Sequence, residues 1–193
     1  MLLTTSADPH GALSAPSSWI QRWTHLLPPG GRVLDVACGS GRHMRWFAQQ
    51  GHPVTGVDRS PEALSTAGAF GQTVLADIES GPWPFAGQQF EAVIVTNYLW
   101  RERLPDIVQA VAPGGVLLYE TFARGNESVG KPSRADFLLG NGELLQACAG
   151  LRIVAYEDGF LVAPERFVQR IAAVRPGNHP GETPPRYPLD AQG

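Results

Sequence analysis

The sequence predicts an α/β fold in which a single domain holds a doubly wound parallel sheet with helices on both faces. Segments typical of strands and helices alternate from about residue 30 to residue 125, as they do where helices connect parallel strands. Residues 90–99, FEAVIVTNYL, are almost unbroken in their apolar run, which is typical of a parallel strand covered on both faces. A chain of 193 residues has a length that suits one domain.

The first element is a helix, because apolar residues in 17–26 recur at helical spacing and Pro-Pro-Gly-Gly follows them. Short apolar runs bounded by turn residues predict strands at 32–38, 53–58, 73–77, 90–99 and 116–122. Helical patterns predict helices at 43–50, 60–70, 104–115 and 141–150. Ser60 is the expected N-cap of one of them, with Pro61 at its first position. Residues 151–158 and 166–176 are expected to form a closing antiparallel pair.

Three segments organise the chain. Residues 1–29 are an N-terminal segment and helix that we expect to close over the functional site, and residues 30–175 form the main domain. Residues 176–193 are rich in proline, which predicts an extended or disordered tail.

Composition excludes several classes of function. The net charge of −3 argues against a nucleic-acid-binding protein, which needs a basic surface. The N-terminus lacks a signal-peptide pattern and no apolar run approaches a membrane span, so we expect a cytoplasmic protein without a membrane partner. The two cysteines and five histidines show no metal-ligand spacing, so no metal is expected. Cys38 is interpreted as a small, tightly packed side chain.

Residues 35–43, DVACGSGRH, carry the strongest functional signal. Gly39 and Gly41 follow a strand and open a helix, which allows a tight turn and lets a ligand touch the main chain. An acid, Asp58, stands at the end of the next strand. In a doubly wound sheet this edge binds the ligand, and the pattern therefore predicts a nucleotide-type cofactor.

Two side chains indicate which cofactor this is. A dinucleotide motif has a third glycine where this chain has Met44, which disfavours a nicotinamide-dependent oxidoreductase. Asp35 would place negative charge near a pyrophosphate, whereas it suits a ligand with a cationic centre. S-adenosylmethionine carries a sulfonium, an ammonium and a ribose but no phosphate. We therefore predict S-adenosylmethionine as the cofactor.

The acids at the strand ends have expected roles and structural alternatives. Asp35 faces the cationic end of the cofactor or, alternatively, is a buried carboxylate satisfied only by loop amides. Asp58 accepts hydrogen bonds from the ribose, unless it merely caps the following helix. Asp77 accepts from the adenine amino group, unless it only makes an Asx-turn.

These motifs together resemble class I S-adenosylmethionine-dependent methyltransferases, through VLDVACGSGRH, VTGVDRS, LADIES, FEAVIVTNYL and PGGVLLYETF. The resemblance covers residues 30–175 and implies a Rossmann-like sheet of about seven strands, mostly parallel with an antiparallel last strand. The small size, GSGRH and FLLGNGELLQACAGLRIVAYEDG are similar to bacterial methyltransferases of the tellurite-resistance type. Members with tellurite activity carry a histidine–arginine pair after the YEDG-like segment, where this chain has Phe160 and Leu161.

The residues expected to contact the cofactor lie in the glycine turn and at the ends of the first four strands. They are Asp35, Ala37, Gly39, Ser40, Gly41, Arg42, His43, Asp58, Arg59, Ala76, Asp77, Ile78, Thr96 and Asn97. Arg42 is expected to meet the methionine carboxylate beside the helix N-terminus. His43 lines the methionine end of the cofactor or, alternatively, faces solvent.

Methyl transfer from a sulfonium needs alignment and a dry pocket more than a strong base. We expect Tyr98, Arg101 and Glu120 to face the acceptor, since they follow or end the fourth and fifth strands. The alternatives are packing for Tyr98 and an ion-paired or solvated surface for the other two. Residues 122–137 form either a mobile lid with anion-binding cations or a plain polar loop. Arg124, Lys131 and Arg134 are the cations of this loop.

The predicted function is transfer of a methyl group to a small, soft nucleophile such as a thiol or an oxyanion of selenium or tellurium. A non-catalytic module that binds S-adenosylmethionine is the main alternative, and a nicotinamide-dependent oxidoreductase is a weaker one. The expected partner is a small-molecule substrate, and the chain is expected to act as a monomer or homodimer.

Overall fold

The structure is a computed structural model that describes residues 14–177 and 185–189. Its strands are β1 (Val33–Val36), β2 (Val54–Asp58), β3 (Gln72–Leu75), β4 (Phe90–Thr96), β5 (Val111–Phe122), β6 (Arg152–Val162) and β7 (Glu165–Val174). Its α-helices are α1 (Ser18–Trp23), α2 (Arg42–Gln49), α3 (Pro61–Ala67), α4 (Leu104–Gln109) and α5 (Glu143–Ala147). Single 3-10 turns lie at η1 (Thr24–Leu26), η2 (Arg101–Arg103), η3 (Asn126–Ser128) and η4 (Ala135–Phe137).

The seven strands form one sheet in the order β3-β2-β1-β4-β5-β7-β6. The first five strands pair in parallel, and β7 pairs antiparallel with both β5 and β6. The predicted fold class is therefore confirmed, including its antiparallel closing strands. Strand order reverses between β1 and β4, and in such sheets the ligand crevice lies at this point, beyond the carboxyl ends of the strands.

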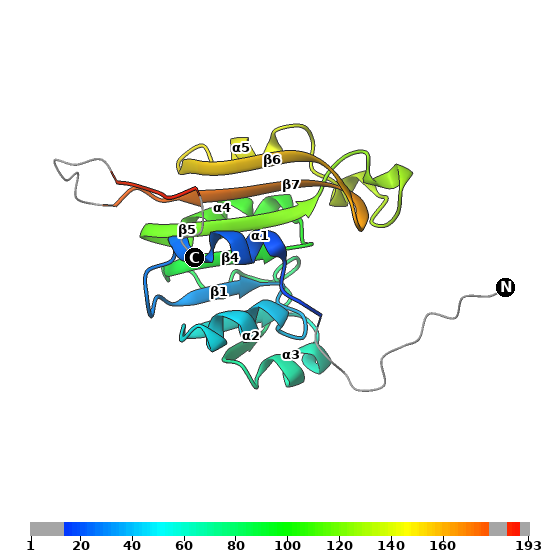
Figure 1. The fold of residues 1–193 in the computed structure, drawn as a ribbon. Coiled ribbons are helices and arrows are strands. Elements are labelled where there is room, and N and C mark those ends of the chain that lie inside the picture. Colours follow the sequence, from blue (N-terminus) through cyan, green and yellow to red (C-terminus); the bar gives the residue numbers. More distant parts are fainter. Residues whose placement is uncertain (1–13, 178–184, 190–193) are drawn as a thin grey trace.

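Helices cover both faces of the sheet (Figure 1). The apolar residues of α1, α2 and α3 pack in one core with the side chains of Val33, Ala92 and Ile94. Those of α4 and α5 pack in a second core with the opposite face of β1 and β4. The alternation of the two cores along each strand follows from the two-residue period of a β-strand.

The N-terminal helix α1 packs in the same core as α2 and α3. Trp19 and Trp23 are buried, their rings meet at 5.6 Å, and the indole N–H of Trp19 donates to the carbonyl of Ile171 in β7. Of the tail, residues 185–189 contain no helix or strand. Tyr187 packs beside the same core, and a ring nitrogen of His25 lies 2.9 Å from the Pro188 carbonyl. Residues 1–13 of the N-terminal segment lie outside the described part of the chain.

One predicted element is wrong in its extent. The helix expected over 104–115, with Pro-Gly-Gly at 113–115 as its exit, ends at Gln109, and residues 111–115 belong to β5. Phe90 pairs with Val111, but Ala92 pairs with Val116, so the strand is irregular between them. Pro113 has no N–H to donate and Gly114 has a φ of +78°, which together prevent a regular helix at this place. The N–H of Gly114 donates instead to the Arg175 carbonyl.

No helix within residues 14–177 and 185–189 is long and apolar enough to cross a membrane.

The close approach of α2 to β2 depends on Gly56. A methyl group at Gly56 would overlap the Sδ of Met44 and lie 2.7 Å from the Sγ of Cys38. Met44 and Cys38 therefore pack directly against β2. A dinucleotide motif has its small residue, a glycine, in the helix, whereas here the small residue is Gly56 in the strand. The expectation that Cys38 is a tightly packed side chain agrees with its burial.

We predict that Gly56→Ala lowers the free energy of unfolding by about 1–3 kcal/mol, because the added carbon overpacks this contact. Urea unfolding followed by circular dichroism measures the change. Gly159→Ala is the matched control, since Gly159 also lies in a strand but has no atom within 4 Å of its added methyl group. Equal stability of the two variants would contradict the proposed contact.

Candidate functional site

The glycine turn forms the floor of a crevice at the carboxyl ends of β1, β2, β3 and β4. The N–H of Cys38 donates to the Val57 carbonyl, and Gly39 and Gly41 have φ values of +54° and +84°. At Gly41 a side chain would also lie 3.0 Å from Ala67 in α3. Glycine is thus required here both by the backbone conformation and by the close approach of the two helices.

Two recesses make up the crevice and share Ala37. The larger, with a volume of about 670 Å³, is lined by Ser14, Ala37, Cys38, Gly39, Ser40, Arg42, His43, Thr66, Thr96 and Asn97. The smaller, with a volume of about 200 Å³, is lined by Ala37, Asp58, Arg59, Ala76, Asp77, Ile78, Glu79 and Tyr98. All predicted cofactor residues except Asp35 and Gly41 line one of the two recesses. Asp35 lies buried beside the turn, and Gly41 caps α2.

Asp35 is a buried carboxylate with few partners. The amide N–H of Met44 donates to it, while its Oδ2 has no hydrogen-bond partner within the described ranges. Burial raises the pKa of Asp35 to about 7, although the nearby Arg42 guanidinium opposes this shift. The alternative that loop amides satisfy the carboxylate therefore accounts for only part of its hydrogen-bonding capacity.

Asp58 has a structural role that the sequence did not predict. One carboxylate oxygen accepts from the N–H of Gly39 and the other from the N–H of Ser60, both at 2.9 Å. Ser60 itself caps α3 by accepting from the Ala63 N–H, as predicted. The carboxylate of Asp58 thus joins the glycine turn to the start of α3 while it lines the smaller recess.

Asp77 makes the Asx-turn that was its structural alternative. Its Oδ1 accepts from the N–H groups of Glu79 and Ser80, and these bonds lower the pKa of its carboxyl. The side chain still borders the smaller recess, beside Ile78. The Asx-turn therefore does not remove Asp77 from the crevice.

His43 is buried, so the alternative that it faces solvent is wrong. The amide N–H of Ser17 donates to its Nε2 at 3.0 Å, which requires the proton to be on Nδ1. Its Nδ1 lies 3.5 Å from the hydroxyl of Thr96. Burial, helped by the neighbouring Arg42 charge, lowers the pKa of His43 to about 3, so the ring is neutral near pH 7. On this side of the crevice His43 can donate a hydrogen bond but cannot accept a proton.

The three predicted acceptor residues do not lie together. Tyr98 lines the smaller recess beside Asp58 and Asp77. Arg101 forms an ion pair with Glu143 at 2.7 Å and donates to two carbonyls of residues 136–138, outside both recesses. Glu120 is buried and lines neither recess.

Glu120 leads to residues that the sequence analysis missed. The hydroxyl of Ser17 donates to its carboxylate at 3.1 Å, and Arg166 and Arg170 lie 3.5 and 3.3 Å from it. Arg170 stands opposite Glu120 across the β5–β7 pair. Only this register could have revealed the cluster, because these residues are far apart in the sequence. Ser17 connects it to the crevice through His43.

The N-terminal segment reaches the crevice in its described part. Ser14 borders the larger recess, and its carbonyl accepts from Arg45 in α2. Of the loop expected to act as a lid, Arg134 pairs with Asp136 on the surface. The loop and the β6–β7 hairpin project at the same end of the sheet (Figure 1).

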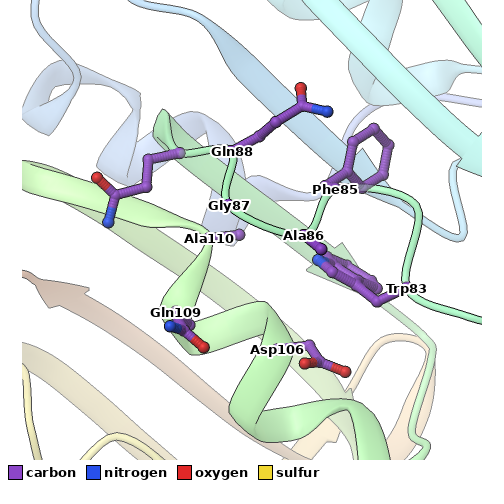
Figure 2. A pocket seen from close by; sticks show the side chains of 9 residues that line it. Trp83, Phe85, Ala86, Gly87, Gln88, Asp106, Gln109 and Ala110 are labelled. Atoms are coloured by element: carbon purple, nitrogen blue, oxygen red, sulfur yellow. The ribbon is translucent and has the colours of Figure 1, made fainter.

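A further recess lies at the opposite ends of the strands. It is lined by Gln89, which precedes β4, and by Gln109 at the end of α4. Its volume is about 360 Å³, and Trp83, Phe85, Asp106 and Gln109 are among its lining residues (Figure 2). Because it opens at the amino ends of β4 and β5, it does not join the crevice that holds the predicted site residues.

Fold and crevice together are those of a doubly wound α/β domain with a ligand crevice where the strand order reverses. Residues 33–115 match the family model described as a methyltransferase domain. Malonyl-[acyl-carrier protein] O-methyltransferase of Serratia marcescens is 34% identical over 107 residues, which are 51% of this chain and 41% of that protein. The chain spans about half the length of the curated relatives it matches.

Solved structures agree in fold. TehB from Haemophilus influenzae has a TM-score of 0.61 at 20% identity, over 75% of this chain and 57% of that one. An S-adenosylmethionine-dependent methyltransferase from Methanosarcina mazei has a TM-score of 0.66 at 16% identity, over 86% and 100%. The comparisons support the predicted resemblance to methyltransferases over residues 33–115, and the solved structures agree with the predicted fold.

The pKa of Asp35 predicts a pH-dependent cost to stability. A carboxyl whose pKa is raised from 3.8 to about 7 on folding binds more protons in the folded than in the unfolded chain between those values. Stability attributable to Asp35 therefore falls as the pH rises from about 4 to about 7. We predict that Asp35→Asn is more stable than the wild type at about pH 8, by about 1–3 kcal/mol, and that the advantage shrinks toward about pH 4.

Denaturant unfolding at both pH values measures this difference, with Glu62→Gln as a control at an exposed acid of α3. The same Asp35→Asn protein is expected to bind S-adenosylhomocysteine more weakly than the wild type. A pH-independent stability difference would show that the Asp35 carboxyl is not the titrating group.

Proposed function

We propose that this chain is an S-adenosylmethionine-dependent methyltransferase that acts on a small-molecule acceptor. The observation that carries the proposal is the incompletely partnered Asp35 carboxylate, buried beside a glycine turn whose crevice is lined by further acids. A crevice with carboxylates beside the two glycines of the turn suits a cofactor with a cationic centre and no phosphate. When bound, the cofactor supplies an electrophilic methyl group on its sulfonium.

The smaller recess would hold the adenosine part of the cofactor, and the larger recess its methionine part. Asp58 would accept from the ribose hydroxyls and Asp77 from the adenine amino group, both in the smaller recess. Arg42, whose guanidinium otherwise donates to Thr96, would meet the methionine carboxylate in the larger one. Asp35 would stabilise the positive charge of the methionine end through the field of its carboxylate.

For the acceptor we propose a soft nucleophile, such as a thiol or an oxyanion of selenium or tellurium. The neutral His43 offers a donor and no free base, which suits a nucleophile that needs no deprotonation at the site. Arg166 and Arg170 face one buried carboxylate, and the Nε of Arg166 has no partner in the described residues. Neither arginine lines a recess of the crevice, and Ser17 connects the cluster to His43 in the larger one. Both arginines lie on β7, whereas Phe160 and Leu161 occupy the region in which the family resemblance would place a histidine–arginine pair.

The absence of a free base at His43 also favours a second candidate function, a module that binds S-adenosylmethionine without catalysis. The crevice holds an imidazole whose acceptor nitrogen is already occupied by the Ser17 N–H. Methyl transfer to a thiolate or an oxyanion does not require a base, and the two candidates therefore differ only in turnover.

Ligand-induced thermal shifts test the cofactor class. S-adenosylhomocysteine is expected to raise the melting temperature of the protein, and NAD is not, because Asp35 and Met44 oppose a dinucleotide. Stabilisation by NAD alone would overturn the proposal in favour of an oxidoreductase.

Asp58→Ala is predicted to weaken S-adenosylhomocysteine binding about tenfold or more, because a buried charged hydrogen bond to the ribose contributes roughly 1.5–3 kcal/mol. Titration calorimetry measures the affinity, and Glu62→Ala is the control. The 2′- and 3′-deoxy analogues of S-adenosylhomocysteine distinguish a ribose contact of Asp58 from its hydrogen bond to Gly39. If the contact is direct, the wild type binds these analogues more weakly than S-adenosylhomocysteine, and Asp58→Ala does not. Unchanged affinity in Asp58→Ala would show that the ribose assignment is wrong.

Transfer of a labelled methyl group to a panel of thiols, selenite, tellurite and small amines tests catalysis. Transfer to any member supports the enzyme. Tight binding of S-adenosylhomocysteine without transfer to any of them favours the non-catalytic module.

A further inference from the structure

Tyr98 is held in place by the fifth strand. Asn97 has a φ of +54°, and its N–H donates to the carbonyl of Glu120, so the chain turns sharply as it leaves β4. The hydroxyl of Tyr119 then donates to the carbonyl of Tyr98 at 2.8 Å. These two bonds hold the main chain at Asn97 and Tyr98, and the Tyr98 side chain lines the smaller recess rather than the larger one.

The hydroxyl of Tyr98 is buried without a partner. Tyr98 packs against the core that also contains Val95 of β4 and Ile107 of α4, yet its oxygen makes no hydrogen bond within residues 14–177 and 185–189. A buried hydroxyl without a partner costs free energy, and such a group in a native protein calls for an explanation. Tyr98 lines the smaller recess, so a ligand bound there could provide the missing hydrogen-bond partner of its hydroxyl.

Few side chains of the recess can donate a hydrogen bond. Its other polar side chains include the carboxylates of Asp58, Asp77 and Glu79, which only accept. Arg59 also lies there, but its guanidinium pairs with Glu79 at 3.3 Å. A purine has an exocyclic amine that donates and ring nitrogens that accept. The carboxylates satisfy the amine, and a neutral hydroxyl is the group that satisfies a ring nitrogen.

Tyr98 is neutral and can therefore donate. Burial raises the pKa of its phenol, and the negative charge of Glu79 raises it further.

We propose that Tyr98 is a specificity residue for the base of the cofactor, whose hydroxyl donates a hydrogen bond to a ring nitrogen of the purine. The inference rests on the proposed function and assigns Tyr98 to the cofactor rather than to the methyl acceptor. It predicts that Tyr98 affects cofactor affinity and leaves recognition of the acceptor unchanged.

The first experiment compares Tyr98→Phe with Tyr156→Phe. Tyr156 also loses only a hydroxyl, one that donates to Asp158 on β6, outside the crevice. By titration calorimetry, Tyr98→Phe is expected to bind S-adenosylhomocysteine about five- to tenfold more weakly, and the control to bind as the wild type does. Equal affinity of Tyr98→Phe and wild type would overturn the inference.

The second experiment identifies the hydrogen bond with 1-deaza, 3-deaza and 7-deaza S-adenosylhomocysteine, each of which lacks one ring nitrogen. Wild-type protein is expected to lose about five- to tenfold in affinity for one of the three, and Tyr98→Phe is expected to show no further loss for that analogue. Independent, multiplicative losses would contradict a direct bond. This series on the wild type alone also decides the matter if Tyr98→Phe does not fold, since full affinity for all three analogues excludes the contact.

The outcomes separate the inference from the proposed function. If the wild type does not bind S-adenosylhomocysteine, both fail. If it binds tightly and neither the variant nor any analogue changes the affinity, only the assignment of Tyr98 fails. Where the enzyme transfers methyl groups, the KM for the acceptor in Tyr98→Phe is expected to equal that of the wild type while the KM for S-adenosylmethionine rises.

Discussion

The burial of one carboxylate at the centre of the sheet constrains the structure around it. Asp35 stands in β1, one of the two strands between which the strand order reverses, and in the described residues the amide of Met44 is its hydrogen-bonding partner. A charge in this position is costly unless a counter-charge approaches, so the shape of the surrounding turn determines what can approach. The glycines expose main chain, and Arg42 lies close enough to lower the cost without removing it.

The crevice is built by elements that come from both ends of the domain. Ser17 caps α1, and it also donates its N–H to His43 and its hydroxyl to Glu120. The N-terminal helix, the first turn of α2 and the end of β5 are thereby joined at one residue. Arg170 extends the connection to Glu157 in β6, and Arg22 of α1 reaches the same carboxylate. The closing hairpin is thus connected by ion pairs to α1 and to the end of β5.

Several polar groups in the crevice have both a structural and a functional interpretation. Asp58 and Asp77 each accept two main-chain amides, so both carboxylates hold loops in place before any ligand binds. Such bonds orient the remaining lone pairs toward the recess and reduce the loss of freedom on binding. Hydrogen bonds that hold a loop, or an Asx-turn, are therefore compatible with a ligand contact, because a carboxylate has more acceptor positions than either role uses.

The sequence alone determined the alternation of strands and helices, the glycine turn and the acids at the strand ends, because each of these depends on local periodicity and turn chemistry. The predicted C-terminal end of α4 was wrong, because Pro113 and Gly114 belong to β5, and β5 pairs with strands that are distant in the sequence. Only the tertiary structure decided that Arg166 and Arg170 face Glu120, that Gly56 makes room for Met44, and that Tyr98 belongs to the smaller recess. These placements follow from strand register and from packing between distant segments, and neither leaves a pattern in a single stretch of sequence.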